Sequence, residues 1–598
     1  MWRWKSMLAF LLIICHSVNA QEYDSFTAIS EFMGISSPEE IDPSEAERLE
    51  KFIERPLRIN EADLSRINQS GLLTHYQTVS LLDYRSRHGD ILSFMELASV
   101  DGFTDEFVRK LAPFISLESV RLPGQGRAES KRILQELEMK GGIKGSDGVK
   151  HQYAFKYRIE AGEKFQASLA LSKSPDAIKP DAFSGGLFWN SRSGTTKIAL
   201  GKFNARFGQG LALWSGMSLS GLSKPSSYVK RTSYLSPSYS YTGNYAFKGV
   251  ALQTIKNDFM LTFLSAVTSS KEGVGLLPAT NLSWLLHDGQ VGLTHYVDFG
   301  FHSHGANIRD MKTSCDVAFA AKGVDFFAEI AYGWASHTAA SLAGVVFPVS
   351  EDLRMASMLR YYPSSYIPTY SAATRALTKC SNEYGASLSS EFNAGGWVNI
   401  KGAEGFGASS RRLLGAVCLD AAYFPVSKSK DGGRSIQLKS LVEMKMMLSS
   451  SIALKLRLTE RYRTWENPFR TDIRLDWLFY SRYVDAVFRA NLVKCAGMGF
   501  LSYVEGTVKP ERFKISFRTG WFHADRWEDR IYAYERDIPG SFNVPAFYGQ
   551  GYWLSILASS KISKWGSLSL RGSLTGYPFE EKKKPGKAEL KLMLRFRI

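Results

Sequence analysis

The last segment of the chain alternates apolar and charged residues at almost every position. The apolar residues are Leu590, Leu592, Leu594, Phe596 and Ile598. The charged residues between and before them are Glu589, Lys591, Arg595 and Arg597. Successive side chains of a β-strand point to opposite faces, so this pattern predicts a strand with one apolar and one charged face. A closing strand with an apolar final residue is typical of exported β-barrels.

The same pattern recurs from about residue 150 to the C-terminus. Ile473, Leu475 and Trp477, for example, alternate with Asp472 and Arg474. There are roughly 18 to 24 such segments of about ten residues, the length that crosses a bilayer at a tilt. No stretch after the first twenty residues is apolar for about 18 positions, so no spanning helix is expected.

These observations predict a mainly β chain, with residues 150–598 forming a large transmembrane antiparallel β-barrel. Aromatic residues make up 13% of the chain, and Tyr361, Trp465 and Trp521 lie near segment ends, as in the aromatic girdles of membrane barrels. Closing the barrel would satisfy every backbone hydrogen bond, which lipid requires. A soluble β-protein, which also alternates, is the alternative.

Residues 1–20 are predicted to be a signal peptide. Arg3 and Lys5 precede a short apolar stretch, and Val18-Asn19-Ala20 offers a cleavage site. Lipidation at Cys15 is the alternative. Export and a barrel together predict the outer membrane of a Gram-negative bacterium, with lipid, lipopolysaccharide and the barrel-assembly machinery as partners.

The charge is divided unevenly along the chain. Residues 21–120 contain 9 Lys/Arg and 19 Asp/Glu, whereas the whole chain has a net charge of +16 and its first twenty residues contribute +2. Residues 121–598 therefore have a net charge of +24. An acidic head precedes a basic body, and the basic body favours an anionic neighbour.

Residues 21–120 are predicted to form a small helical domain on the periplasmic side of the membrane. Helix-start signals, with proline near the first turn and acids after it, occur at Ser36–Glu40 and Asp42–Glu45. Residues 56–118 contain an internal repeat whose two turn glycines, Gly71 and Gly102, lie 31 positions apart. With the Ile59-Asn60-Glu61-Ala62 opening, this repeat resembles the tandem helix-hairpin-helix domain of competence-type DNA-uptake receptors.

That resemblance implies two hairpins whose backbone amides could meet a phosphate or a protein partner. The hairpin residues are Gly71, Leu72, Leu73, Gly102, Phe103 and Thr104, and a candidate basic patch comprises Arg85, Arg87, Arg109 and Lys110. DNA-binding hairpins have a second glycine, which here is Leu73 or Thr104. Residues 55–117 contain seven basic and eight acidic residues, so a docking role for a periplasmic protein, or a plug-like role, is favoured over DNA binding.

Residues 121–149 contain several glycines and are interpreted as a linker, with a short helix at 127–140. The barrel segment Gly201–Gly216 ends in Phe207-Gly208-Gln209-Gly210 and contains Trp214. Its glycines would permit a close approach of the backbone to a ligand or to the barrel wall, and a connection that folds into the lumen is favoured.

Gly201–Gly216, together with Arg530–Glu535 and Phe542–Gly551, resembles uncharacterised Bacteroidetes-type barrel proteins that have a helix-hairpin-helix head. The resemblance implies an architecture and a location, and no known reaction.

An enzymatic function is not expected. The chain has no HExxH motif, nucleophile elbow or phosphate-binding loop, and no metal or cofactor is predicted. The acidic cluster around Asp525 and Asp529 and the pair His302 and His304 are interpreted as polar surface. The sequence thus predicts a barrel for transport, binding or envelope assembly with an anionic partner, with DNA uptake as the alternative and an outer-membrane enzyme as a second, less favoured one.

Overall fold

The computed structural model describes most of the chain after residue 24. The described residues are 25–119, 133–146, 148–162, 164–216, 220–238, 240–241, 246–270, 273–302, 305–395, 412–429, 431–449, 451–510, 513–579 and 585–598. The predicted signal peptide, most of the linker's first half and His304 lie outside them.

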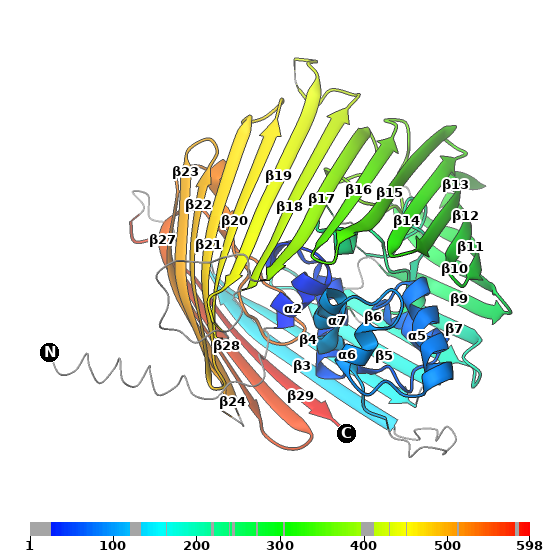
Figure 1. Ribbon diagram of the computed structural model, residues 1–598. Coiled ribbons are helices and arrows are strands. Elements are labelled where there is room, and N and C mark those ends of the chain that lie inside the picture. The colour runs from blue at the N-terminus through cyan, green and yellow to red at the C-terminus, as the bar shows by residue number, and fades with distance from the viewer. Residues whose placement is uncertain are drawn as a thin grey trace.

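Twenty-four antiparallel strands form a closed barrel, as predicted (Figure 1). The ring closes where the last strand, β29 (Lys587–Arg597), pairs with the first, β3 (Ile133–Gly145). The other strands of the wall are β4 (Val149–Ala161), β5 (Phe165–Lys173), β6 (Ala182–Asn190), β7 (Thr196–Arg206), β9 (Phe247–Lys256), β10 (Phe259–Ser270), β11 (Gly273–Leu286), β12 (Gly289–His302), β13 (Gly305–Ala321), β14 (Val324–Gly333), β15 (Thr338–Ser350), β16 (Leu353–Tyr362), β17 (Glu383–Gly395), β18 (Arg412–Phe424), β19 (Ser435–Met447), β20 (Ile452–Arg463), β21 (Phe469–Tyr480), β22 (Val484–Lys494), β23 (Met498–Val508), β24 (Phe513–Ala524), β27 (Gly549–Lys561) and β28 (Gly566–Gly576).

The barrel exposes its apolar face and buries its charged face. On β29, Leu590 and Leu592 are 50% and 42% exposed, whereas Arg595 is only 9% exposed. This reverses the pattern of a soluble protein, and it is what lipid outside and a polar lumen inside require. The chain is therefore a transmembrane β-barrel of the outer membrane, and the prediction from period-two alternation is confirmed.

The prediction of a linker at 121–149 with a helix at 127–140 is wrong from residue 133 onward. The barrel begins at Ile133 instead of residue 150. Residues 133–145 form β3, whose inward Glu136 and Glu138 are buried. A Cβ atom at Gly142 would lie 2.7 Å from the Gln152 side chain, so this glycine fits a crowded strand. Pairing with β29, more than 400 residues away in sequence, determines the strand.

The two ends of the barrel differ in their connections. The end that carries both barrel termini has short turns of two to five residues, apart from the connection 396–411, which is not described. Three long connections lie at the opposite end: 207–246, 363–382 and 525–548. Short turns are periplasmic and long loops extracellular in such barrels, so the termini lie on the periplasmic side.

The head consists of short helices and one small parallel strand pair. Its elements are α2 (Ser25–Phe32), η1 (Pro38–Glu40), α3 (Pro43–Glu54), β1 (Leu57–Arg58), α4 (Leu64–Ser70), α5 (His75–His88), α6 (Phe94–Ala98), α7 (Asp105–Leu111), η2 (Ala112–Phe114) and β2 (Ile115–Ser116). Asp42 caps α3 with Pro43 as the first helical residue, as the sequence predicted, and Thr74 with Gln77 forms a capping box at α5. None of the described helices is both long and apolar enough to cross a membrane.

The head does not hang below the barrel but lies inside it, among the strands of the ring (Figure 1). Its own apolar core includes Phe32, Leu49, Ile67 and Phe114, all at most 2% exposed. Its contacts with the wall include the periplasmic turns, since His75 lies 3.1 Å from the carbonyl oxygen of Leu286. The head thus fills the periplasmic half of the lumen.

Candidate functional site

Residues 25–54 of the head, here called the acidic segment, contain eight carboxylates and only two basic side chains. Seven of the eight carboxylates bond to the barrel wall or to an inward connection. The contacts are Glu31–Lys445 (3.1 Å), Glu39–Arg474 (3.2 Å) and Arg489 (2.8 Å), Glu40–Arg457 (2.5 Å), Glu45–Arg206 (2.8 Å), Glu47–Lys156, Glu50 with the amide of Gly540 (3.1 Å), and Glu54–Arg595 (2.5 Å) and Arg597. The eighth, Asp42, caps α3.

The partners of the acidic segment come from strands on both sides of the barrel closure. Arg457, Arg474 and Arg489 lie on β20, β21 and β22, whereas Lys156 and Arg206 lie on β4 and β7. The uneven charge of the sequence is therefore explained by these contacts, in which acidic residues of the head neutralise part of the basic inner wall. Such contacts hold the head on several sides at once.

The carboxylates of Glu45 and Glu39 are held in their charged form. Burial alone would raise the pKa of Glu45, but the guanidinium groups of Arg206 and Arg48 lower it well below its ordinary value. Burial also opposes ionisation of Glu39, and Arg474 with the amide of Tyr534 lowers its pKa. Breaking one such buried pair leaves a desolvated charge alone, which costs about 3–5 kcal/mol.

Glu50 is the exception within the acidic segment. Burial and the neighbouring Glu54 raise its pKa from 4.5 to about 7, and its bonded partner is the amide of Gly540 instead of a cation. At neutral pH this carboxylate is therefore partly protonated. The acidic segment contains one group whose charge weakens the docking of the head.

The glycine-rich motif at the end of β7 binds the barrel wall, as the favoured interpretation of the sequence expected. The backbone turns at Gly208 and presents three amides to the carboxylate of Glu329 on β14. Gln209, Leu211 and Ala212 donate hydrogen bonds of 2.7, 3.0 and 3.2 Å to it. Three amides on one carboxylate make a strong, directional attachment.

Gly208 has no room for a side chain. Its φ is +56°, and a Cβ atom would lie 2.9 Å from both the Asp316 Cβ atom and a carboxylate oxygen of Glu329. Phe207 is buried, and Gly210 also has a positive φ of +84°. The first inward connection, residues 207–246, is thus fixed across the lumen on β13 and β14.

The other long connections meet the first one and the head. From 363–382, Tyr366 donates a 3.0 Å hydrogen bond to the carbonyl oxygen of Leu211, and the Trp214 amide donates to Tyr370 at 3.1 Å. From 525–548, the Tyr534 ring lies 4.7 Å from Phe26 of α2, between ring centres. The inward connections and the head therefore contact one another inside the lumen.

The first hairpin of the head, predicted to meet a phosphate or a partner, is buried inside the protein. Gly71 ends α4 with φ +62°, and Leu72 and Leu73 are at most 2% exposed. Ser233 of the first inward connection would be 3.4 Å from a Cβ atom at Gly71. In this arrangement the first hairpin contacts the barrel's own loop and is closed to a large ligand.

The second hairpin is more open. Gly102, with φ +82°, and Thr104 are exposed, whereas Phe103 is buried in the head. The Gly102 carbonyl accepts a 2.9 Å hydrogen bond from Gln77, and Thr104 caps α7.

The predicted basic patch does not gather at either hairpin. Arg85 donates to the carbonyl oxygens of Ala62 and Asn60 within the head. Arg87 pairs with Asp83, and Lys110 pairs with Glu106 and with Glu391 of the wall, at 2.7 Å each. Only Arg109 is exposed without a carboxylate partner among the described residues. These side chains build the head and fix it to the wall.

The acidic cluster of the third connection also has bonded partners. Asp525 accepts the Met498 amide at 2.8 Å, Asp529 accepts the Gly497 amide at 3.0 Å, and Glu535 pairs with Arg571 at 2.8 Å. Among the residues described, no three His, Cys, Asp or Glu side chains are placed to hold a metal ion. The cluster shapes the connection.

Sequence reasoning missed the residues that hold the head and the first connection. The alternation placed Arg474 on the charged face of a strand without a partner, and the sequence singled out neither Arg489 nor Glu329. The one available signal was that Glu329 interrupts the otherwise apolar stretch Phe326–Ile330. Nothing local pairs it with a glycine motif more than 100 residues earlier.

Comparison with known proteins finds likenesses to solved structures only. No family model and no curated protein matches the chain significantly. Similar solved structures include Pseudomonas aeruginosa OccK11 (OpdR), at 8% identity, covering 78% of this chain and 96% of that one, TM-score 0.29. The siderophore receptor PirA from Pseudomonas aeruginosa has 8% identity, 79% and 81% coverage and a TM-score of 0.40. The translocation pore of the P pilus usher PapC has 10% identity, 78% and 99% coverage and a TM-score of 0.36. These values are too low for function to be inferred.

Replacing Gly208 by alanine is expected to detach the first inward connection. The positive φ costs an alanine about 1 kcal/mol, and the Cβ atom must also displace Asp316 or Glu329. We expect limited proteolysis to cleave within 207–246 faster than in the wild type. Gly432→Ala is the matched control, because Gly432 has φ +72° and open space around it. Equal cleavage in both variants would contradict the attachment.

Glu50→Gln is expected to stabilise the protein at pH 8 and to leave it unchanged at pH 4. The pKa of Glu50 is raised from 4.5 to about 7 in the folded protein. The stability that protonated Glu50 contributes is therefore fully present below pH 4.5 and is lost as the pH rises through 7. Glutamine avoids that loss, a gain on the order of 1–2 kcal/mol for a partly solvated group.

Thermal unfolding of the detergent-purified chain at both pH values measures this difference. Glu118→Gln is the control, because the Glu118 side chain is 78% exposed. A pH-independent effect of Glu50→Gln would show that ionisation of Glu50 does not oppose docking.

Proposed function

We propose that this protein is an outer-membrane transport protein whose lumen is closed by its own N-terminal head, and that cargo passes when the head is displaced. The observation that carries the proposal is the set of seven carboxylates that join the acidic segment to the wall and its connections. A plug held mainly by ion pairs can leave while exposing few apolar groups, and its released charges are hydrated.

The chemistry of this interface supports a movable plug. Interfaces within a chain permit relative motion unless they are large and hydrophobic. Most of the apolar core of the head is its own, with Phe32, Leu49 and Phe114 packed internally, and one connection of the barrel joins it through Tyr534. It meets the wall mainly through charged side chains, so the head can move as one unit.

The wall that the head covers indicates an anionic cargo. Displacing the acidic segment would uncover Arg457, Arg474 and Arg489 along three adjacent strands. A lumen lined by cations raises the local concentration of anions. The head thereby occupies the positions that an anionic cargo would take. DNA is one such polymer, but the burial of the first hairpin gives it no particular support.

Reversing two charges of the acidic segment is expected to open the barrel. Glu39→Lys with Glu45→Lys places cations against Arg474, Arg489 and Arg206 and should raise the conductance of the purified protein in planar bilayers several-fold. Asp83→Lys with Asp101→Lys makes the same change of charge on head residues with no wall contact in the described structure. A conductance that rises equally in both double variants, or in neither, contradicts the plug.

A second function, docking of a periplasmic protein, is favoured by one exposed apolar group on the head. Leu92, Phe94 and Met95 are 82%, 41% and 86% exposed, although the head does not face lipid. Exposed apolar groups on a soluble surface mark contacts with a partner. The exposed Asp101 and Asp105 nearby have no cationic partner among the described residues, so the partner segment would be apolar and basic.

Leu92→Asp with Met95→Asp is expected to abolish uptake of cargo by cells while leaving the conductance of the purified barrel unchanged. The reason is that both side chains point into solvent and support no contact of the plug with the wall. Leu92→Met with Met95→Leu, which keeps the group apolar, serves as the control. Normal uptake by the aspartate variant would remove the docking function without affecting the plug.

A further inference from the structure

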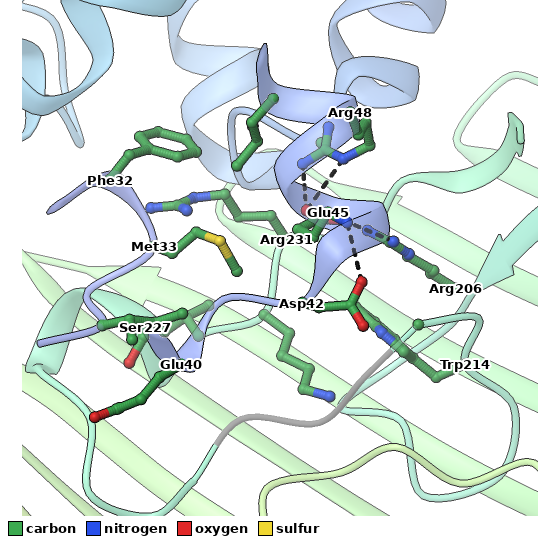
Figure 2. A pocket seen from close by; sticks show the side chains of 16 residues that line it. Phe32, Met33, Glu40, Asp42, Glu45, Arg48, Arg206, Trp214, Ser227 and Arg231 are labelled. Carbon is green, nitrogen blue, oxygen red and sulfur yellow. Dashed lines mark hydrogen bonds and ion pairs between the residues drawn. The ribbon is translucent and has the colours of Figure 1, made fainter. Parts of the chain in front are cut away.

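A small cavity lies where the head meets the first inward connection (Figure 2). It encloses about 100 Å³, enough for a group of a few atoms. Phe32, Met33 and Leu49 of the head form an apolar side, and Arg206, Lys230 and Arg231 bring three cations from the barrel. The cavity therefore joins two parts of the chain that meet only inside the lumen.

Arg231 has no carboxylate to neutralise it. Figure 2 shows its side chain reaching past Met33 toward Phe32, and the guanidinium carbon lies 4.3 Å from the centre of the Phe32 ring. Among the described residues, no hydrogen bond or salt bridge joins Arg231 to any group. Its half-buried guanidinium therefore contacts the rings of Phe32 and Phe107, and its donors bond to no acceptor among the described residues.

Lys230 is in a similar position. Its ammonium group donates a 2.5 Å hydrogen bond to the Ala372 carbonyl and lies 4.3 Å from the Trp214 ring centre, with no carboxylate in salt-bridge range among the residues described. Burial lowers the pKa of Lys230 to about 7 and that of Arg231 to about 10. Both shifts reflect cations that lack a counter-ion.

The carboxylates that line the cavity bond elsewhere, except for one oxygen of Asp42, which is buried without a hydrogen-bond partner among the described residues. Glu45 is shared between Arg48 and Arg206, as the dashed lines in Figure 2 show. Glu40 pairs with Arg457 at 2.5 Å, and Asp42 accepts the first amides of α3. Four cations therefore surround a cavity to which Glu45 and Asp42 contribute two carboxylates, and Glu45 alone is shared between two of the cations. Buried charges are normally paired, so the residues around the cavity have fewer negative charges than positive ones to pair with.

We propose that this cavity is a binding site for a small oxyanion, a carboxylate or a phosphate group, that bonds to Arg231 and Lys230. The flat guanidinium of Arg231 suits two oxygens of either group. The group can be a free ion or the anionic end of a larger molecule, with any short apolar part against Phe32 and Met33.

A bound oxyanion would join the head to the first inward connection. Its cationic ligands come from residues 230–231, while the apolar side comes from α2 and the residue after it. Anything that binds the docked arrangement better than the released one stabilises docking by mass action. This inference does not require transport, since the site can stabilise a permanent plug equally well.

Direct binding to the full-length, detergent-purified protein tests the site, with inorganic phosphate and acetate as separate probes. Isothermal titration gives the dissociation constant, and the fluorescence of Trp214 beside Lys230 provides a second reading. We expect saturable binding of at least one probe, and Arg231→Gln should raise its dissociation constant at least about tenfold. Lys428→Gln, an exposed lysine of another extracellular connection, is the matched control and should change nothing.

The outcomes are distinct. Phosphate alone, acetate alone or both, with loss in Arg231→Gln and retention in Lys428→Gln, each support the site and identify the group it accepts. Binding of neither probe, or equal binding by both variants, overturns the inference. Arg231→Lys keeps the charge and guards against misfolding, because weak but measurable binding is expected from it. Conductance is not used, so failure here leaves the plug proposal intact.

Discussion

Pairing between the acidic segment and the basic inner wall is the interaction on which the filled barrel depends. A membrane barrel turns its apolar residues to lipid, which leaves polar and charged side chains for the lumen. A domain inside such a lumen cannot be held by a shared apolar core. Complementary charge replaces that core, with Glu39 between Arg474 and Arg489 as its most buried example.

The head is nevertheless a small globular unit with an interior of its own. Phe32, Ile67 and Phe114 pack together away from the wall. The third inward connection is the exception to the charged interface, because Tyr534 and Phe542 join this core from the barrel side. Release of the head would therefore expose few apolar groups, and most of those would belong to one connection.

How much of this follows from the sequence depends on whether the deciding contact is local. Period-two alternation is local, so the barrel and its lipid-facing residues such as Leu590 and Leu592 were predictable. The split of charge between head and body was visible too, but not which carboxylate meets which cation. The glycines of residues 141–145 suggested a linker because the partner that makes them a strand, β29, lies at the other end of the chain.

The two closures of the lumen differ in what it costs to open them. The first connection is fixed by backbone amides on Glu329, which lies directly opposite Asp316 in the strand pairing. Withdrawing those amides would leave the Glu329 carboxylate without its donors and beside Asp316, an arrangement that like charges disfavour. The head instead leaves separate cations and carboxylates that water can solvate. Of the two structures that close the lumen, the first inward connection is therefore the more permanent. The head is the one suited to move.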